Sequence, residues 1–449
     1  MTRPDAQTLP TSAPSTASRA LAAAGDAQSA RDVAALDDAA EGAKRRLQAR
    51  RQSLVQRLIY GPPPPPEELL AGGQLVEQGP DAAARSALAA ALDCLQRGQA
   101  FTAHGKLSAE LRGALARQRA YGFTVPAEFG GAGGSYTQLA LLEEELAANG
   151  LGALAVEISG QLTIGAGSLL AYGTGAQKSL FLPMLSEGRL MAFGLTEVGV
   201  GVNAKKVGAY VEWDAGADCW RLFASGDRAK LYITNATHGA LVGLVARLGQ
   251  GGKQVGLFVL ELPSQDVQRG QPLADGSLAD FDFECRPTGV SAFQANHNAR
   301  LSFDNFPIPK QQQIEADGVE VLFYCLRLGR CMLAAMSAGY QRMLAADALH
   351  FARQRDGVGG RVVRHELPRL NLGKVLGGAL QARALSHLSL EQDAAGADLA
   401  GLRDLTKSAA AGTALESLHA TEHVLGGRTF HLGQRSSEAR ANLHVFGVV

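Results

Sequence analysis

Cysteine is scarce in this chain of 449 residues, and no two cysteines form a CxxC pair. The five that occur are odd in number and spread along the chain, at Cys94, Cys219, Cys285, Cys325 and Cys331. A disulfide framework needs paired cysteines, and a cysteine zinc site needs ligands at short spacing. The composition therefore argues against both, and it predicts a cytoplasmic protein in a reducing environment.

Net charge is also lacking, because 43 basic side chains are balanced by 43 acidic ones. Nucleic-acid binders owe their affinity to a basic surface that neutralises phosphates, so no nucleic-acid partner is expected. No apolar run approaches the roughly 18 residues of a membrane helix, and no compact apolar stretch precedes a small-residue cleavage site near the N-terminus. The sequence predicts neither a membrane span nor a secreted precursor.

Apolar residues, by contrast, are plentiful at 46%, with only 19% charged. This composition is typical of a globular chain with a large core and differs from that of disordered proteins. A chain of this length exceeds one ordinary core, so two or three domains are expected.

Residues 1–66 are predicted to form an N-terminal extension. It opens with a tail rich in Ala, Ser, Thr and Pro. Leu47, Leu54 and Leu58 then recur at helical spacing among lysines and arginines, which indicates a basic amphipathic helix. That helix either docks on the main body through its leucines or engages a partner or a membrane surface. Pro62 to Pro66 follow as a stiff polyproline spacer.

Three further domains follow from the changing periodicity of the apolar residues. Residues 67–190 are mostly of helical period, and the helix predicted from Thr137 to Ala148 carries three glutamates on its expected polar side. Residues 191–306 consist of short alternating runs separated by Gly, Asp and Asn, typical of a β domain. Residues 307–449 contain three long helical patterns, so an α+β fold ending in an antiparallel helical bundle is expected.

Two short motifs suggest chemistry that their surroundings do not favour. Residues 199–204 match the GxGxxA dinucleotide fingerprint, but residues 207–213 alternate like a strand where that fingerprint needs a helix. His419, Glu422 and His423 fit the HxxEH zinc pattern. A catalytic zinc needs a third protein ligand, and Glu438 is the sole carboxylate after His423, which leaves only that residue or one upstream for the role. We expect a glycine turn at the first motif and no metal at the second.

Five segments in a fixed order carry more information. They are Val125-Pro126-Ala127-Glu128-Phe129-Gly130-Gly131, Tyr172-Gly173-Thr174-Gly175-Ala176-Gln177-Lys178, Ala192-Phe193-Gly194-Leu195-Thr196-Glu197, Tyr232-Ile233-Thr234-Asn235 and Val424-Leu425-Gly426-Gly427-Arg428-Thr429-Phe430. Together they resemble the acyl-CoA dehydrogenase family of flavoproteins, from about Tyr121 to the end of the chain. The resemblance implies a helical N-terminal domain, a central β-barrel-like domain, a C-terminal helical bundle and non-covalently bound FAD.

The resemblance also implies where the flavin ring would bind. Leu195 and Thr196 occupy the family's Leu-Thr-Glu segment, where backbone N–H groups at a strand edge hold the polar edge of the ring, and Phe193 just before it is a further candidate cofactor contact. Tyr232 and Thr234 match the family's aromatic-Ile-Thr element, which places an aromatic ring and a hydroxyl against the flavin. Tyr stands for the more usual Trp and keeps a flat apolar face.

Further positions are implied on the C-terminal helices. Arg330 matches an arginine near the substrate, and Arg355 one that reaches the flavin diphosphate of a neighbouring subunit; arginine suits phosphate because of its planar fork. A homodimer or homotetramer follows from that arrangement. The remaining cofactor contacts implied by the resemblance are His365, Glu366, His423, Gly426 and Gly427.

The chain departs from the family at two places. Val202 stands where a serine contacts the cofactor phosphate and the acyl carrier's arm, and Lys205 and Lys206 are candidates to substitute for it. The catalytic Glu is missing from both places where members carry it. One falls just beyond Val449, which suggests a truncated chain, and the other is Gly329.

The expected function is FAD-dependent desaturation of an acyl thioester, by proton abstraction and hydride transfer to flavin N5. The acyl group would be carried by coenzyme A or a carrier protein, and the electron acceptor would be a flavoprotein or oxygen. Two alternatives remain: a flavin monooxygenase on the same fold, and a non-catalytic subunit that binds a partner through its basic N-terminal helix.

Overall fold

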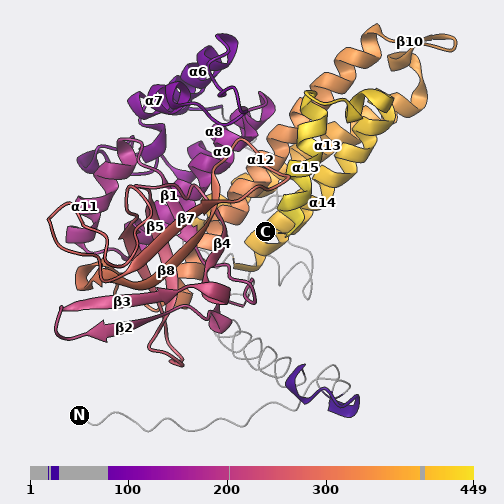
Figure 1. Ribbon diagram of the computed structural model, residues 1–449. Helices are drawn as coiled ribbons and strands as arrows, with labels where there is room; N and C mark the ends of the chain where they lie inside the picture. The colour runs from indigo at the N-terminus through magenta and orange to yellow at the C-terminus, as the bar shows by residue number, and fades with distance from the viewer. Residues whose placement is uncertain (1–18, 20–21, 30–78, 202, 395–399, 449) are drawn as a thin grey trace, which may run out of the picture. The chain divides into compact units, whose positions relative to one another are not determined.

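A computed structural model describes residues 19, 22–29, 79–201, 203–394 and 400–448 (Figure 1). The chain divides into two compact units, residues 1–69 with 397–401 and residues 70–396 with 402–449. The second unit contains the sheet and the helices that surround it. Most of the predicted tail, the basic helix, the polyproline spacer and the candidate Val202 lie outside the described residues.

The N-terminal helices begin where the sequence supplies a capping side chain. Their bounds are α6 Ala82–Gln96, α7 Ala109–Arg117, α8 Tyr136–Ala148 and α11 Gly175–Ser186, with short 3₁₀ turns η1 Ala120–Gly122 and η2 Ala127–Phe129. Asp81, Ser108, Ser135 and Thr174 each accept a hydrogen bond from an amide in the first turn of these helices. Such caps satisfy amide donors that otherwise have no partner, so they define where each helix starts.

The helical stretch from Gly152 to Tyr172 is irregular. It consists of α9 Gly152–Ser159, a π-helical turn η3 Gly160–Gly165 and α10 Ala166–Tyr172. At the end of the turn the amide of Ala166 donates to the carbonyl of Gln161, five residues earlier. A π turn inserted in an α-helix is uncommon and frequently lies at a functional site.

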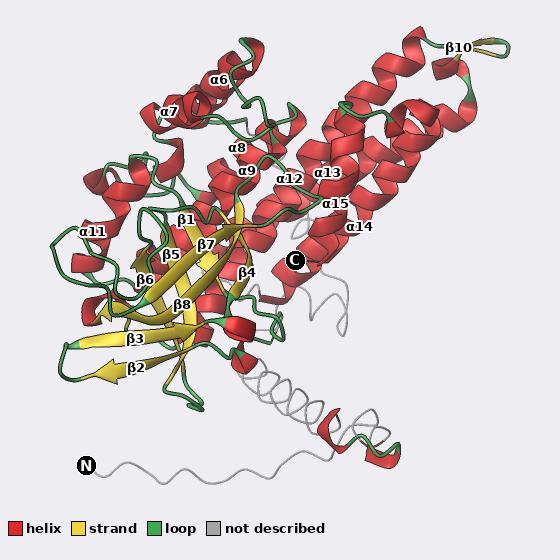
Figure 2. Ribbon diagram, in the orientation of Figure 1, coloured by secondary structure: helices red, strands yellow, loops and turns green. Residues whose placement is uncertain are grey.

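The central domain is a mixed sheet of nine strands (Figure 2). The strands are β1 Met191–Gly194, β2 Tyr210–Asp214, β3 Cys219–Ala224, β4 Lys230–Thr234, β5 Leu241–Leu248, β6 Val255–Glu261, β7 Asp282–Pro287, β8 Asn298–Pro309 and β9 Gln313–Ile314. The main path runs β4-β8-β3-β2-β5-β6-β9, with β1 paired to β5 and β7 to β8. β1 and β2 run parallel to β5, and the other pairs are antiparallel.

The C-terminal domain is a bundle built around one long helix. The helices are α12 Gly318–Gln354, α13 Glu366–Ala394, α14 Ala400–Leu425 and α15 Arg435–Val448; β10 Asp356–Gly357 and β11 Gly360–Arg361 form a small hairpin between α12 and α13. Short 3₁₀ turns occupy Ala204–Lys206, Gly226–Arg228, Lys310–Gln312, Val362–Arg364 and Gly426–Phe430. The expected order of helices, sheet and helical bundle is confirmed (Figure 1).

Among the described residues, two helical stretches are long and apolar enough to cross a membrane by length and composition alone. They are Gly152–Tyr172 and Gly318–Gln354, but 78% and 61% of their most apolar windows are buried within the protein. Their apolar residues therefore already have a partner in the core.

The prediction that the glutamates of α8 lie on a polar side is wrong for two of the three. Glu143 and Glu144 are 0% and 1% exposed, because α8 packs between other helices on the face that carries them. The Glu144 carboxylate accepts hydrogen bonds from Arg342 Nη1 at 2.7 Å and Arg383 Nη1 at 3.4 Å. Burial raises the pKa of Glu143 well above its ordinary value, which favours the neutral acid.

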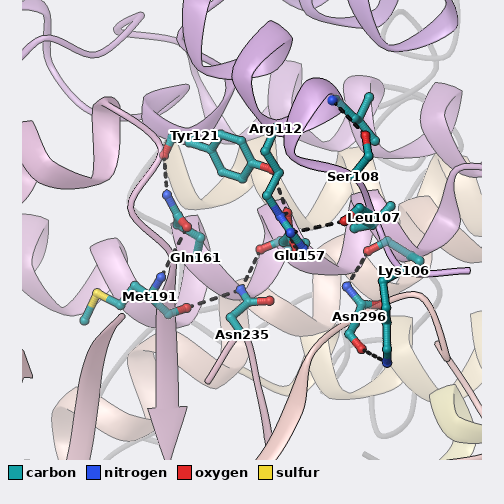
Figure 3. A network of polar contacts seen from close by, with 12 residues as sticks. Lys106, Leu107, Ser108, Arg112, Tyr121, Glu157, Gln161, Met191, Asn235 and Asn296 are labelled. Carbon is teal, nitrogen blue, oxygen red and sulfur yellow. Dashed lines mark hydrogen bonds and ion pairs between the residues drawn. The ribbon is translucent and has the colours of Figure 1, made fainter. Parts of the chain in front are cut away.

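Glu157 on α9 is the centre of a second buried ion pair (Figure 3). Its carboxylate accepts hydrogen bonds from Arg112 Nη2 at 2.6 Å, Arg112 Nε at 3.0 Å and the Tyr121 hydroxyl at 2.6 Å. The Glu157 side chain is fully buried and that of Arg112 is 20% exposed. These contacts tie α9 to α7 and to the turn η1.

We predict that Glu157→Gln lowers the free energy of unfolding by about 2 to 3 kcal/mol, because it leaves the Arg112 charge largely buried without its partner. Urea denaturation of the full chain measures this. The control is Arg97→Ala, which breaks an exposed pair with Asp93 on α6 and should cost less than about 1 kcal/mol. Equal effects of the two substitutions would contradict the prediction.

Candidate functional site

One group of candidate residues gathers where β1 ends beside β4. The group, called the sheet-edge cluster below, consists of Phe193, Leu195, Thr196, Tyr232 and Thr234. The two strands meet because the amide of Leu231 donates to the carbonyl of Thr196 at 2.9 Å. Leu195 and Thr196 are half-buried, so their side chains reach the surface.

Tyr232 is the most unusual residue of the sheet-edge cluster. Its φ is 57°, in the left-handed region, and the pairing of β4 with β8 shifts register between Lys230 and Ile233. A bulge of this kind re-aims a side chain, and a left-handed φ at an aromatic residue costs about 1–3 kcal/mol. The result is a tyrosine that is 63% exposed at the edge of the sheet.

The other members of the sheet-edge cluster are held by neighbouring strands. The Thr234 hydroxyl donates to Asn298 Oδ1 on β8 at 2.7 Å, which fixes its orientation. The Phe193 ring lies against β5 at Gly243, where a Cβ atom would come within 3.2 Å of the ring. Gly243 therefore leaves the space that Phe193 occupies.

A buried ion pair between Lys230 and Glu197 lies next to the sheet-edge cluster. Lys230 is fully buried, and its Nζ donates to Glu197 Oε1 at 2.7 Å, to the Val245 carbonyl at 2.8 Å and to the Leu195 carbonyl at 3.4 Å. The Glu197 carboxylate also accepts from the amides of Gly208 and Ala209, at 2.7 and 3.1 Å. Burial lowers the pKa of Lys230 to about 8, although the charge of Glu197 opposes that shift.

Arg330 lies on α12 and forms an ion pair with Asp404 of α14. Its neighbour Gly329 faces the π turn, because a Cβ atom there would lie 3.8 Å from Ile164 Cγ1 and Thr163 Oγ1. Position 329, one of the two expected for the catalytic Glu, is thus in contact with η3. Arg330 itself is positioned by a partner within the bundle.

The remaining candidates gather at the far end of the bundle. This group, called the tip cluster below, consists of Arg355, His365, Glu366, His423, Gly426 and Gly427. An apolar cluster brings the end of α12, the start of α13 and the end of α14 together there; it contains Ala348, Ala352, Leu372, Val424 and Leu425. Arg355 and His423 are exposed, and Gly426 has a left-handed φ of 59° that suits glycine.

α12 separates the two clusters: the π turn beside the sheet-edge cluster contacts it at Gly329, about 38 Å before its C-terminal end, where the tip cluster lies. Its first residue packs on the sheet, where a Cβ atom at Gly318 would come within 2.5 Å of the Val255 carbonyl of β6. From there its 37 residues extend about 55 Å to the hairpin that precedes the tip cluster. Figure 1 shows the hairpin and the sheet well apart. One chain therefore brings together the members of each cluster but does not bring the two clusters to each other.

The two isolated motifs have local roles. After Gly201, the GxGxxA segment continues into a three-residue 3₁₀ turn and then β2, so no helix begins there to face a diphosphate. In the HxxEH segment the Glu422 carboxylate pairs with His419 at 3.4 Å and with Arg440. Among the described residues no group of three or more His, Cys, Asp or Glu side chains is arranged to hold a metal ion.

The sequence reasoning missed Asn235 and Gln161, which connect the sheet-edge cluster to the N-terminal helices (Figure 3). Asn235 Nδ2 donates to the carbonyls of Glu157 and Met191, at 2.9 and 3.3 Å. Gln161 Nε2 donates to the Tyr121 carbonyl at 3.0 Å. Asn235 is the last residue of the Tyr232-Ile233-Thr234-Asn235 segment, and its place in that segment is the sequence signal that could have identified it.

Family comparison agrees with this architecture. Residues 83–189 match the acyl-CoA dehydrogenase N-terminal domain, and residues 316–444 match the acyl-CoA dehydrogenase C-terminal domain. The matches flank the sheet and together cover more than half of the chain, which defines a protein built on the acyl-CoA dehydrogenase fold. The chain belongs to the acyl-CoA dehydrogenase family.

Individual relatives are distant. The very long-chain specific acyl-CoA dehydrogenase of Rattus norvegicus is 27% identical over 253 residues, which are 54% of this chain but only 36% of that protein. Butyryl-CoA dehydrogenase from Megasphaera elsdenii superposes with a TM-score of 0.70 at 21% identity, covering 82% of this chain and 94% of the other. A glutaryl-CoA dehydrogenase from Mycobacterium smegmatis, in complex with FADH2, gives 0.69 at 20% identity, covering 85% and 93%. The structural likenesses establish the fold.

The lowered pKa of Lys230 predicts a pH effect on stability. The folded state releases the Lys230 proton near pH 8 and the unfolded chain near 10.5, so between these values the unfolded state binds more protons. The contribution of Lys230 to the free energy of unfolding therefore rises with pH across that window, by up to about 1.4 kcal/mol per pH unit.

Urea denaturation of the wild type and Lys230→Met between about pH 7 and 10 tests this effect. The difference in unfolding free energy, wild type minus variant, should grow as the pH rises. A pH-independent difference would show that Lys230 keeps an ordinary pKa in the folded protein.

Proposed function

We propose that the chain is an FAD-dependent oxidoreductase that desaturates acyl thioesters between the α and β carbons. The observation that carries this proposal is the sheet-edge cluster, in which an exposed Tyr232 stands beside Leu195 and Thr196 at the end of β1, between two acyl-CoA dehydrogenase domains. Family membership supports the same activity. The chain spans 36% of the length of the very long-chain relatives, so the activity of the whole protein is inferred from this shared part.

The residues present have the chemistry that FAD requires. The Tyr232 ring supplies a flat apolar face for the isoalloxazine, and the Thr196 hydroxyl and backbone supply polar contacts for its pyrimidine edge. Arg355 supplies a guanidinium for the diphosphate, and Gly427 has open space where a Cβ would stand, so a dinucleotide can approach its backbone. Bound FAD supplies the acceptor for the hydride that leaves the β carbon.

The separation of the two clusters supports a homodimer or homotetramer. FAD is shorter than the roughly 38 Å of α12 between Gly329, beside the π turn, and the tip cluster, so one molecule cannot contact the sheet-edge cluster and the tip cluster of the same chain. A complete site then combines the sheet-edge cluster of one copy with the tip cluster of another. This arrangement gives Arg355, exposed at the end of α12, a phosphate partner in the neighbouring site.

The substrate would be an acyl thioester of coenzyme A or of a carrier protein, and the acceptor a flavoprotein or oxygen. Arg330 would lie near the substrate, with its orientation set by Asp404. No carboxylate stands at position 329, so the α-proton base is not assigned to a residue of α12. A cytoplasmic location fits the five free cysteines, all of which are buried.

The first prediction of this proposal concerns the aromatic face. Purified full chain should show the visible spectrum of bound flavin, and an acyl thioester added without oxygen should perturb that spectrum. Tyr232→Asn should weaken FAD binding by about tenfold, because it removes the ring while asparagine tolerates the left-handed φ. Fluorescence titration of FAD into apoprotein measures this affinity.

The matched control is Tyr210→Asn, which removes a tyrosine ring stacked on Phe223 elsewhere in the same sheet. It should leave the FAD affinity unchanged. A protein that shows no flavin spectrum and takes up no FAD would refute the proposed function.

The second prediction concerns the tip cluster. Arg355→Ala should weaken FAD binding by about tenfold or more, because a charge-assisted contact to phosphate is lost. Arg353→Ala, also exposed in the last turn of α12, should change the affinity less than about twofold. Sedimentation velocity should show at least a dimer whenever FAD is bound. Full flavin occupancy in a monomer would contradict the two-copy site.

A further inference from the structure

Asn235 connects the strand that carries Tyr232 and Thr234 to the N-terminal helical domain. It follows β4 directly, is 1% exposed and has a left-handed φ of 66°. Its amide donates to the His297 carbonyl at 2.9 Å, and its Nδ2 donates to the carbonyls of Glu157 and Met191. One side chain thus holds the end of β4 to both α9 and β1 (Figure 3).

The bond to Glu157 lies at the start of the π turn. A side-chain donor that takes a helical carbonyl competes with the regular ladder of helix hydrogen bonds, which is a known origin of helix irregularity. Gly160, the first residue of η3, lies against the same side chain, because a Cβ atom there would be 3.6 Å from Asn235 Nδ2. The wide turn and the end of β4 are therefore in direct contact.

The π turn also contacts β1 and α12. A Cβ atom at Gly165 would come within 2.9 Å of Met191 on β1, so the end of η3 packs tightly on that strand. Thr163 and Ile164 in its middle face Gly329 of α12, next to Arg330. The position of η3 therefore determines the spacing between the sheet edge and α12.

The helix that Asn235 holds is itself fixed. The carboxylate of Glu157 is bound by Arg112 and Tyr121, and Gln161 bonds the Tyr121 and Leu185 carbonyls while its Oε1 accepts from the amide of Met191 at 3.3 Å. Asn235 is thus the connection from a rigid helix to a strained strand end.

We propose that Asn235 is a positioning residue for the flavin site: through the π turn Gly160–Gly165 it fixes where the β4 end presents Tyr232 and Thr234 relative to α12. This assignment rests on the proposed function for its effect on FAD. Its structural part, the coupling of the β4 end to the π turn, does not need a flavin.

The test compares two buried asparagines that make the same bond to the same helix. Asn296 Nδ2 donates to the Ala153 carbonyl of α9 at 2.8 Å and is 0% exposed, but it lies outside β4 and outside the π turn. The variants are Asn235→Asp and Asn296→Asp, each of which keeps the shape and replaces the Nδ2 amino group with a carboxyl oxygen that cannot donate when ionised. Asn235→Gly is a second variant that keeps the left-handed backbone, should the Asp substitution prevent folding.

Two measurements on the full chain separate positioning from stability. FAD titration of apoprotein should show about tenfold weaker binding for Asn235→Asp and Asn235→Gly, and less than about twofold for Asn296→Asp. Hydrogen exchange of apoprotein should show about tenfold faster exchange in residues 160–166 for the Asn235 variants only. The flavin absorption band should shift in the Asn235 variants alone, since a loss of stability does not move it.

The FAD affinities and the exchange rates can each overturn the positioning role of Asn235. Equal FAD affinities of the two Asp variants, or unchanged affinity of Asn235→Gly, would overturn the positioning role. If the wild type takes up no FAD, the proposed function fails, and exchange alone decides the inference. Faster exchange confined to the Asn235 variants then supports the coupling, and equal exchange in all variants overturns it.

Discussion

A buried ionised carboxylate needs donors, and the Glu157 side chain takes them from two different parts of the chain, while its backbone carbonyl binds a third. Its oxygens bind Arg112 of α7 and the Tyr121 hydroxyl of η1, and its own carbonyl accepts Asn235 from the end of β4. The cost of leaving one of these groups buried without a partner is a substantial fraction of the net stability of a domain. Electrostatics at this one residue therefore sets how the helical domain, the π turn and the sheet edge stand relative to one another.

The sequence was sufficient for the order of domains and for the ends of the long helices. The pattern predicted helices at about Leu367–Glu391 and Leu402–Leu425, and the structure has α13 at Glu366–Ala394 and α14 at Ala400–Leu425. It was sufficient because apolar periodicity reports which face a helix buries. The family segments are contiguous in sequence, so the sequence could also name the sheet-edge and tip residues as candidates.

What the sequence could not predict were contacts between distant residues. Glu143 and Glu144 look like a solvated face until Arg342 and Arg383, about two hundred residues later, are known to cover that part of α8. The left-handed φ of Tyr232 accompanies a register shift against β8, and the helix before the π turn is bonded by Asn235, which follows β4. Each of these features arises from contact between two segments that are distant in sequence, and neither segment alone predicts it.

The length of α12 has a genetic consequence. In the proposed two-copy arrangement, each flavin site would take its ring platform from one chain and its phosphate contact from another. A mixed dimer of a chain defective at the sheet edge and a chain defective at the tip then contains one site with both defects and one site with none. Two separately inactive alleles, expressed together, would restore part of the activity that neither provides alone. The reason is that α12 keeps the two clusters of one chain apart, so that each site combines two chains.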